Sequence, residues 1–460
     1  MTEKDYKNLS QIVGKDYLIT DEEQVPSYLF DQVEIAYRPE ADYNSIVVKP
    51  SSTEEVSQIM KYAYDNNITV VVRGGATGLC GGCTPIKESI ILSMERMNHI
   101  LEIDEKNMVA VLEAGVTLMQ LLEELEKYDN LSFPVHPGDE GAQMGGMAVT
   151  NAGGARAVRH GVMRKHIQGI EVVLPTGETL MLGGKLIKNN AGYNLCQLIL
   201  GSEGTLAIIT RVILKIYPKD NYSATMVAPF EKFEDAVSAV MDILRTCTMP
   251  LAVEYMDKAL FTGTAEMLGL EWQAKEGEAD LLIILSERSE ELLFDAVKSI
   301  NEICEKNHSL DTLLAEKKKE QDELLLIRSE HYSYIVDMIC DSFDMAVPVS
   351  SIPAFISDLK ALAAEYNTGT NIVAHIADGN VHNDIWYVEG KTPDYAKELK
   401  EKMYKACFSY GGTITGEHGI GKIRTEDLKL QKSEKELELM RGIKKVFDPK
   451  GLLNPGTVIC

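Results

Sequence analysis

The chain has 460 residues, 45% of them hydrophobic, which is enough for two or three domains with buried cores. Its formal charge of −24 would repel nucleic acid and anionic membrane surfaces, so it excludes polyanion binding and favours a basic partner surface. No apolar run has membrane-spanning length and the N-terminus lacks a signal-peptide pattern, so we expect a soluble, cytoplasmic protein without membrane insertion. Eight scattered cysteines form no disulfide framework and are expected to be mostly buried thiols.

The first forty residues are polar and irregular, and they predict no regular element. Ser52 and Glu55 match a capping box that begins a helix, and Thr117 with Gln120 matches a second one. Short apolar or β-branched runs predict strands at residues 46–49, 69–72, 89–93, 100–103 and 109–113. The N-terminal part of the chain therefore alternates short strands with amphipathic helices.

A glycine-rich loop, Arg73 to Gly82, directly follows the strand at residues 69–72. A Rossmann loop would have Gly-x-Gly-x-x-Gly spacing and would lead into a helix. This loop has neither feature, because it ends in Cys83-Thr-Pro85 and another strand. We expect phosphate to be held here by loop amides together with Arg73.

The stretch from His136 to Gly161 is the most unusual part of the sequence, with seven glycines in 26 residues. So many glycines argue against a stable helix or strand. Bare backbone N–H groups can approach a phosphate closely, and the interleaved Met144, Met147 and Val149 indicate a buried loop. We interpret the stretch as a nucleotide cradle; a flexible surface loop is the alternative.

Residues 167–174 and 179–182 predict a hairpin around Thr176-Gly177. The segment Gly192-Tyr193-Asn194 then leads through a short apolar helix into Gly201-Ser-Glu-Gly-Thr205 and a long apolar strand at residues 206–216. Pro218 marks an expected domain boundary.

These motifs together resemble the FAD domain of the vanillyl-alcohol oxidase-like flavoproteins. Over nearly its whole length the chain is similar to the group of D-lactate dehydrogenase, the glycolate oxidase large subunit and D-2-hydroxyglutarate dehydrogenase. The resemblance implies FAD, with its pyrophosphate on the first loop and on the cradle. The FAD is expected to be non-covalent, because the first loop has no histidine for a covalent link. The residues expected to bind it are Arg73, Gly74, Gly75, Ala76, Thr77, Gly78, Leu79, Pro137, Gly138, Gly145, Gly146, Asn151, Gly154, Gly161, Glu203, Gly204, Ile208 and Asn454.

From Ser223 onward the sequence changes to strand and helix units of moderate length, which predict an antiparallel sheet covered by helices on one face. The expected fold class is α+β, with a two-subdomain FAD-binding domain and a cap (substrate) domain. The expected boundaries are 1–218 for the FAD domain, 219–420 for the cap and metal domain, and 421–460 for a C-terminal segment that returns to the FAD domain. Asn454 in that segment is expected near the isoalloxazine.

Two histidines flank a turn in Ala374-His375-Ile-Ala-Asp378-Gly379-Asn-Val-His382. If Asp378-Gly379 is a two-residue turn, His375 lies directly opposite His382 and both imidazoles share one face. Two imidazoles so placed suit one metal ion. The alternative is a pair of surface histidines stacked across a hairpin.

A further acidic residue and histidine, Glu417 and His418, lie in a glycine-flanked turn. The family resemblance implies that Glu417 joins His375 and His382 as a metal ligand and that His418 is the catalytic base. Two histidines and one carboxylate would accept Zn, Mn or Fe(II). The resemblance also implies that Arg328 binds the substrate carboxylate; a helix-surface ion pair is the alternative role.

The predicted function is therefore FAD- and metal-dependent oxidation of a D-2-hydroxy acid, with D-lactate first. Tyr332 and Phe343 argue for a small apolar substrate end. The sequence has no NAD-binding loop, no four-cysteine pattern for an iron–sulfur cluster, and no membrane segment through which to meet a quinone. The reduced flavin therefore needs a partner, and an electron-transferring flavoprotein is the expected one. Glycolate and D-2-hydroxyglutarate remain alternative substrates. A non-catalytic electron-transfer flavoprotein subunit and a metal-stabilised binding protein without flavin remain alternative classes.

Overall fold

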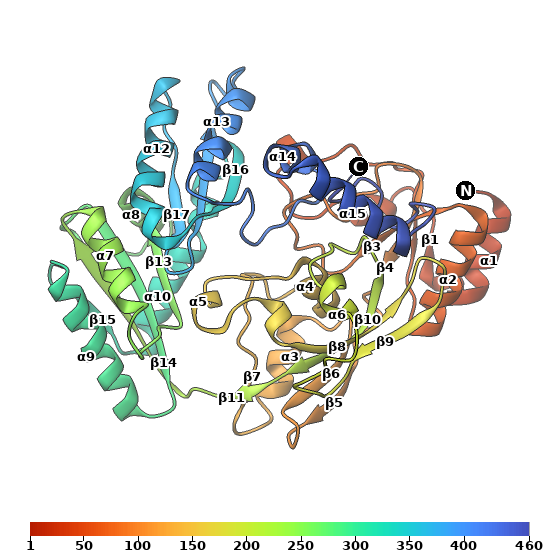
Figure 1. The fold of residues 1–460 in the computed structure, drawn as a ribbon, viewed down its shortest axis with the longest axis horizontal. Helices are drawn as coiled ribbons and strands as arrows, with labels where there is room; N and C mark the ends of the chain where they lie inside the picture. The colour runs from red at the N-terminus through yellow and green to blue at the C-terminus, as the bar shows by residue number, and fades with distance from the viewer. Residues whose placement is uncertain (460) are drawn as a thin grey trace. The chain divides into compact units, whose positions relative to one another are not determined.

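The computed structural model describes residues 1–459, and the chain forms two compact units (Figure 1). The first unit contains residues 1–153, 162–218 and the chain from residue 417 onward. The second unit contains residues 154–161 and 219–416. The C-terminal segment thus belongs to the same unit as the N-terminal part of the chain.

The first unit contains a four-stranded sheet with the strand order β1-β2-β4-β3. Strands β2 and β3 pair with β4 in parallel, whereas β1 pairs with β2 antiparallel. Every residue of β2 is buried, as expected for a strand covered on both faces. The bounds are β1 (Leu18–Ile19), β2 (Ile46–Val48), β3 (Thr69–Arg73) and β4 (Ser89–Ser93).

A five-stranded antiparallel sheet with the order β5-β6-β10-β8-β9 is the second layer of this unit. Strands β7 and β11 form a separate two-stranded pair. The predicted hairpin around Thr176-Gly177 is confirmed as β8 paired with β9. The bounds are β5 (Ile100–Asp104), β6 (Val109–Glu113), β7 (Leu131–Ser132), β8 (Ile167–Val173), β9 (Thr179–Gly183), β10 (Ile208–Lys215) and β11 (Tyr217–Pro218).

The helices of the first unit include one that sequence reasoning missed. Helix α1 begins after a reciprocal capping box between Thr2 and Asp5, within the stretch expected to be irregular. The capping box predicted at Thr117 is confirmed for α3. Ser52 caps α2 as predicted, but the Glu55 carboxylate accepts from the Ser51 N–H, so the box there is not reciprocal. The bounds are α1 (Glu3–Val13), α2 (Thr53–Asn66), α3 (Leu118–Leu125), α4 (Met144–Thr150), α6 (Leu195–Ile199), α14 (Thr425–Gln431) and α15 (Glu434–Phe447).

Helix α4 corrects the expectation that the glycine-rich stretch has no helix. Its residues Gly145 and Gly146 have poor helix propensity, but Met144, Met147 and Ala148 are buried in the core of the unit. A Cβ added at Gly145 would lie 2.7 Å from the Ala114 Cβ. Tertiary packing thus outweighs propensity, and the glycine allows the helix to approach the chain just after β6.

The second unit is built on a seven-stranded sheet with the order β15-β12-β14-β13-β17-β18-β16. All of its strand pairs are antiparallel, which confirms the predicted antiparallel sheet. The bounds are β12 (Tyr222–Phe230), β13 (Ala252–Met256), β14 (Ala279–Glu287), β15 (Leu313–Ala315), β16 (Ile339–Ala346), β17 (Ile372–His375) and β18 (Asn380–Trp386).

Helices pack against both faces of this sheet, which extends the prediction of one covered face. Helices α7 and α9 contact β12 and β14. Helices α8, α10 and α11 contribute to an apolar cluster that includes Met256 and Val373 of the sheet. The bounds are α5 (Ala157–His160), α7 (Phe233–Ile243), α8 (Lys258–Met267), α9 (Glu290–Lys306), α10 (Lys318–Ser329), α11 (His331–Ile335), α12 (Ile352–Glu365) and α13 (Ala396–Ser409).

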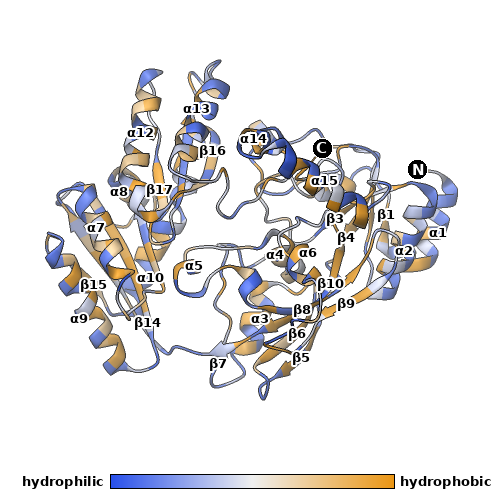
Figure 2. Cartoon of the chain, viewed as in Figure 1, coloured by the Kyte–Doolittle hydropathy of each residue, from blue (hydrophilic) through white to orange (hydrophobic). Residues whose placement is uncertain are grey.

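Apolar residues are concentrated in the sheets. Figure 2 shows the strands of the sheets mainly in hydrophobic colours, whereas α15 is largely hydrophilic. Six of the seven cysteines within residues 1–459 are buried and all seven are free thiols, as predicted; Cys247 is exposed. Among the described helices, none combines the length and apolar character needed to cross a membrane.

Candidate functional site

A cavity in the first unit brings together segments that are far apart in the sequence. The glycine-rich loop after β3, the start of α4, the turn before β10 and the C-terminal tail all contribute to its wall. Its lining includes Gly74, Gly75, Ala76, Thr77, Gly78, Leu79, Pro137, Gly145, Gly146, Glu203, Gly204, Ile208, Glu417, His418 and Asn454. The two predicted nucleotide-binding stretches therefore face one cavity.

Glycines shape this cavity for two different reasons. A Cβ added at Gly75 would collide with the Gly141 carbonyl oxygen, so glycine is needed where the two loops meet. A Cβ added at Gly146 would meet no atom within 4 Å, and Gly146 lines the cavity. The backbone is therefore bare where a ligand could contact it.

Asn454 fastens the C-terminal tail to the cavity wall. Its Oδ1 accepts a hydrogen bond from the Val72 N–H at 2.8 Å, and its Nδ2 donates to the Gly204 carbonyl at 2.9 Å. Asn454 has a φ of 44° and is only 4% exposed. The side chain thus ties the end of β3 to the turn before β10, in the wall where the isoalloxazine was expected.

Glu203 anchors the loop that carries Glu417 and His418. Its carboxylate accepts hydrogen bonds from the Ile420 N–H at 2.8 Å and the Gly421 N–H at 2.7 Å. Burial raises the pKa of Glu203, and these two amides act in the opposite direction. A residue predicted as a cofactor contact therefore also positions the glycine-flanked turn.

Lys422 follows this turn and is partly buried. Its ammonium group donates to the Gly82 carbonyl at 2.5 Å and to the Thr457 hydroxyl at 2.9 Å. Burial lowers the pKa of Lys422 to about 8, although Cys83, Asp31 and Glu203 act to raise it. Sequence reasoning missed this cation, which joins the first glycine-rich loop to the C-terminal tail.

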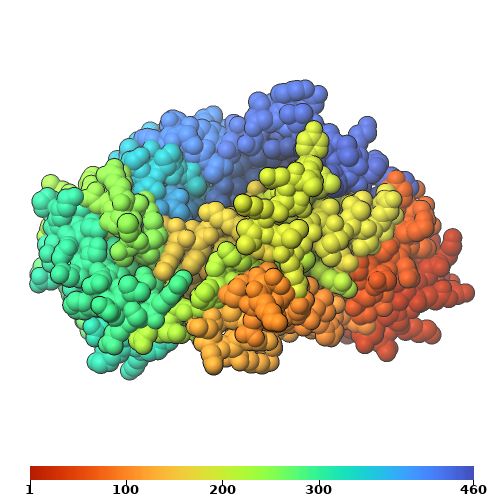
Figure 3. Space-filling view, turned by 60° about the horizontal axis from the view of Figure 1, so that its bottom comes forward, coloured from red at the N-terminus to blue at the C-terminus, as the bar shows by residue number. Residues whose placement is uncertain are grey.

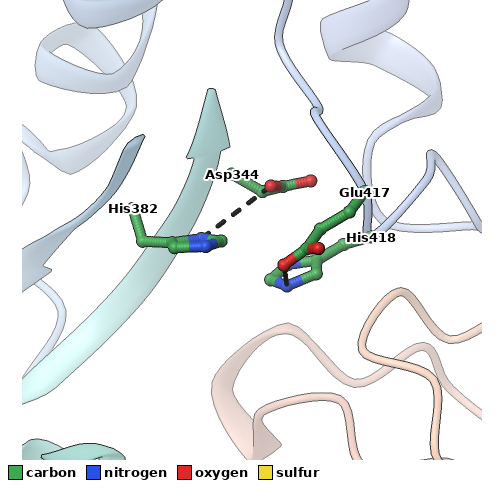
Figure 4. A group of neighbouring side chains, drawn as sticks. All are labelled: Asp344, His382, Glu417 and His418. Atoms are coloured by element: carbon green, nitrogen blue, oxygen red, sulfur yellow. Dashed lines mark ion pairs between the residues drawn. The ribbon is translucent and has the colours of Figure 1, made fainter. Parts of the chain in front are cut away.

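Glu417 and His418 lie close together in the first unit. The Glu417 Oε1 and the His418 Nε2 are 3.7 Å apart, and a dashed line joins them in Figure 4. Both side chains are mostly buried, with exposed fractions of 19% and 28%. Both also line the cavity, so a carboxylate and an imidazole are available at its wall.

The histidine hairpin of the second unit differs in register from the prediction. His375 pairs with Asn380, and His382 pairs with Val373, because the turn contains four residues rather than two. The shift of two residues leaves both histidines on the same face, since side chains alternate along a strand. The imidazole centroids are 5.5 Å apart and their planes are perpendicular. The histidines are diagonal neighbours rather than directly opposed.

Glu254 on β13 contacts both His375 and Arg328. The His375 Nδ1 is 2.7 Å from Oε1, and the Arg328 guanidinium is 2.6 Å from Oε2. Burial would raise the pKa of Glu254, but the charges of His375 and Arg328 outweigh this effect and lower it. Arg328 of helix α10 therefore forms a buried ion pair with a strand residue, rather than an ion pair on the surface of its own helix.

Asp344 on β16 is a buried carboxylate that sequence reasoning missed. It lies opposite His382 across the sheet, and their Oδ1 and Nδ1 atoms are 3.8 Å apart (Figure 4). The other carboxylate oxygen accepts hydrogen bonds from the Thr415 hydroxyl at 2.6 Å and the Gly416 N–H at 3.0 Å. Nothing in the sequence singled out Asp344, because Asp341 and Ser342 are also polar residues of this strand.

The residues that match known protein families cover most of the chain. A family model for the C-terminal domain of FAD linked oxidases matches residues 219–458, and a model for an FAD binding domain matches residues 44–183. The chain belongs to the FAD-linked oxidases. It is therefore an FAD-dependent oxidoreductase, and the resemblance stated from its motifs is confirmed.

Relatives of this FAD-linked oxidase are similar over nearly their full length. It is 40% identical to a D-lactate dehydrogenase of Archaeoglobus fulgidus, over 94% of this chain and 95% of the relative. It is 30% identical to a D-2-hydroxyglutarate dehydrogenase of Stutzerimonas stutzeri, over 90% of each chain. The fold matches that of 4-ethylphenol oxidase from Gulosibacter chungangensis, with a TM-score of 0.76 and 18% identity over 99% of this chain and 96% of that one.

The cavity of this FAD-linked oxidase fits its cofactor. The bare backbone at Gly146 offers contact along the wall, and the Gln143 Oε1 is buried without a hydrogen-bond partner within the described residues. A buried polar atom without a partner is costly unless a ligand completes it. FAD carries hydrogen-bond donors that could satisfy it. The residues present therefore suit the flavin that the family binds.

Five of the residues predicted to bind FAD are not in the cavity lining of the described structure: Arg73, Gly138, Asn151, Gly154 and Gly161. The Arg73 guanidinium instead donates to the Phe30 carbonyl at 2.8 Å and the Ser27 carbonyl at 3.4 Å. This geometry fastens the segment before β2. Asn151 has a φ of 55° at the end of α4, where its Oδ1 accepts from the Arg164 N–H. Gly154 and Gly161 fall in the second unit.

The structure also places two side chains that the sequence analysis singled out, Phe343 and Tyr193. Phe343 is fully buried and packs edge-on against Tyr404, so it cannot line a substrate pocket as suggested. Tyr193 of the Gly192-Tyr193 motif is 97% exposed. It belongs to the segment between β9 and α6, in the yellow surface region of Figure 3. The argument from Phe343 for a small substrate end therefore fails.

Proposed function

We propose that this FAD-linked oxidase oxidises a D-2-hydroxy acid, with D-lactate to pyruvate as the first choice. The main support is that His418 and Glu417 line the same cavity as the glycine-rich loops. An imidazole at such a wall can accept the proton of a substrate hydroxyl. The 40% identity to a D-lactate dehydrogenase supports the choice of substrate class.

The proposal includes a divalent metal, Zn, Mn or Fe(II), held by His375, His382 and Glu417. Two imidazoles and a carboxylate suit these ions. The Glu254 carboxylate accepts from the His375 Nδ1, so Nε2 is the ring atom that would bind the metal. Asp344 beside His382 offers a further oxygen. Such a metal would supply Lewis-acid polarisation of the substrate hydroxyl.

In this proposal His418 is the base and Arg328 binds the substrate carboxylate. The Arg328 Nε is buried and has no hydrogen-bond partner within residues 1–459. One guanidinium nitrogen is engaged by Glu254, but arginine has five N–H donors and can bind a second carboxylate. Bound FAD supplies the acceptor for the hydride. The chain's own groups orient the acid and remove its hydroxyl proton.

Electrons are proposed to leave to a cytoplasmic electron-transferring flavoprotein. The support is the charge of −24, which can steer a partner with a basic surface. Glycolate and D-2-hydroxyglutarate are the alternative substrates, and the similarity to a D-2-hydroxyglutarate dehydrogenase keeps the second in view. A non-catalytic flavoprotein subunit would bind FAD but would leave every hydroxy acid unchanged.

Anaerobic reduction of the purified yellow protein tests this function. We expect D-lactate to lower the flavin absorbance almost to the level of the dithionite-reduced protein. L-lactate should leave the absorbance unchanged. D-2-hydroxyglutarate and glycolate would be compared at equal concentration. If only D-2-hydroxyglutarate bleached the flavin, it would replace D-lactate as the proposed substrate. If no hydroxy acid bleached the flavin, the proposed dehydrogenase activity would be refuted.

A further inference from the structure

Glu254 is a buried carboxylate that connects two functional candidates in the second unit. It lies in the middle of β13 and is 2% exposed. One of its oxygens is 2.7 Å from the His375 Nδ1, and the other is 2.6 Å from the Arg328 guanidinium. His375 is on β17, and Arg328 is near the end of α10. One carboxylate thus joins a strand histidine to a helix arginine.

The pairing between strands explains why these groups meet. Strand β13 pairs with β17, with Tyr255 opposite Ala374. Glu254 precedes Tyr255 and His375 follows Ala374, so in this antiparallel pair they lie opposite each other on the same face of the sheet. The apolar residues on this face include Met256 and Val373, which pack against α8, α10 and α11. Glu254 therefore lies on the apolar face of the sheet, with His375 and Arg328 as its partners.

A carboxylate in this position determines which imidazole nitrogen carries the proton. The carboxylate accepts a hydrogen bond, so the proton of a neutral His375 lies on Nδ1. The lone pair is then on Nε2, the arrangement found where a carboxylate orients a metal-binding histidine. The same carboxylate limits the rotation of the Arg328 guanidinium by an ion pair of 2.6 Å.

We propose that Glu254 is a positioning residue that holds the metal-binding nitrogen of His375 and the carboxylate-binding guanidinium of Arg328 at once. This inference rests on the proposed function, in which His375 binds the metal and Arg328 the substrate. It assigns to one buried side chain a joint control of metal affinity and substrate affinity. Loss of Glu254 would then weaken both, whereas loss of an ordinary buried ion pair would affect stability alone.

Asp280 provides a matched control in the same sheet. It is a fully buried carboxylate on β14 and accepts a hydrogen bond from the Trp272 indole at 2.8 Å. Its cationic partner is Lys258, at 3.4 Å. Like Glu254, it joins a strand to a neighbouring cation, but its partners have no proposed role at the site. Asp280→Asn therefore reports the cost of disturbing a buried carboxylate of this sheet.

The test measures Mn²⁺ binding to the metal-depleted flavoprotein by calorimetry, together with steady-state kinetics on D-lactate. For Glu254→Gln we expect the Kd for Mn²⁺ to rise about 10- to 100-fold, since this is the usual effect of losing the partner of a metal-binding histidine. The KM for D-lactate should also rise, and saturating Mn²⁺ should restore part of kcat. Asp280→Asn should bind Mn²⁺ with the wild-type Kd.

Wild-type Mn²⁺ affinity in Glu254→Gln, or an equal loss in Asp280→Asn, would overturn the positioning role. If circular dichroism showed that Glu254→Gln does not fold, Glu254→Asp would decide, because it keeps the charge but retracts it by one methylene. Its Mn²⁺ affinity should fall, and an unchanged Kd would refute the proposal. His382→Ala separates the two hypotheses: if it also kept full Mn²⁺ affinity, the metal site of the proposed function would fail instead.

Discussion

The cavity of the first unit differs in construction from the histidine face of the second unit, which is the sheet face that carries His375, His382 and Glu254. The cavity is lined by glycine-rich loops, with bare backbone at Gly74, Gly75, Gly145 and Gly146, together with apolar side chains such as Ile208. The histidine face is formed by side chains from paired strands, and buried carboxylates orient its imidazoles and guanidinium. The comparison indicates that glycine-rich loops leave backbone open to a large cofactor, whereas ligands for a small ion require fixed side-chain atoms.

The two regions should therefore fail in different ways when they are mutated. Substitutions in the cavity wall should act through the space available for the flavin. Substitutions among the charged side chains should act through protonation, orientation and catalysis. Lys422 is an exception within the first unit, because it is a charged side chain that contacts the glycine-rich loop after β3.

The largest expected effect is on turnover after loss of the proposed base. His418→Ala should lower kcat by about two to four orders of magnitude, because proton removal by a positioned side chain contributes that much. Flavin content and metal content should stay near the wild-type values, as measured by absorbance and by elemental analysis. Near-normal turnover with a dye acceptor would assign the base to another residue.

A second effect is the pH dependence that Lys422 gives to stability. Burial lowers its pKa to about 8, below the unfolded value of about 10.4. Between these values the unfolded chain binds more protons, so the free energy of unfolding should rise with pH. The rise amounts to about 2–3 kcal/mol of stability from this group.

Denaturant unfolding between pH 7 and pH 10 measures this contribution, and Lys422→Met provides the comparison. The difference in unfolding free energy between wild type and variant should change by that amount over the range. A difference that stays constant with pH would mean that the ammonium is not desolvated in the folded protein.

The smallest expected effect is on flavin affinity at Gly146. No atom lies within 4 Å of a Cβ added there, so Gly146→Leu should fold but should reduce the space in the cavity. We expect FAD affinity to fall by about 10- to 100-fold, equivalent to an overpacking cost of about 1–3 kcal/mol. Gly442→Leu, at an equally open helical glycine in α15 outside the cavity lining, is the control. Equal FAD affinity in both variants would place the flavin elsewhere.

Local sequence patterns determined most of the elements and part of the site. Apolar runs and capping boxes identified many of the strands and helices of both units, although not α1 or α4, because side-chain periodicity and caps act over a few residues. The loop after β3 and the stretch around Gly145 were recognised as cofactor-binding from their glycines, and the family models confirm an FAD domain. Glu417 and His418 were found from a motif that is continuous in sequence.

Tertiary structure alone decided the relations between distant segments. Packing against Ala114 made α4 helical despite its glycines, and Arg73 turned towards the backbone of residues 27–30. A turn of four residues, rather than two, set the register of His375 and His382, since turn length is not fixed by an Asp-Gly pair alone.

Glu254 and Asp344 were not singled out from the sequence, and the contact of the predicted residue Glu203 with the glycine-flanked turn was not foreseen. Glu254 contacts His375 across 121 residues of chain, and Glu203 contacts Gly421 across 218. Asp344 reaches Gly416 across 72 residues. A buried acid has no local signature, because its partners are chosen by strand pairing and loop closure rather than by neighbours in sequence. The sequence therefore named the groups proposed to carry out the chemistry, and only the fold revealed the groups that hold them in place.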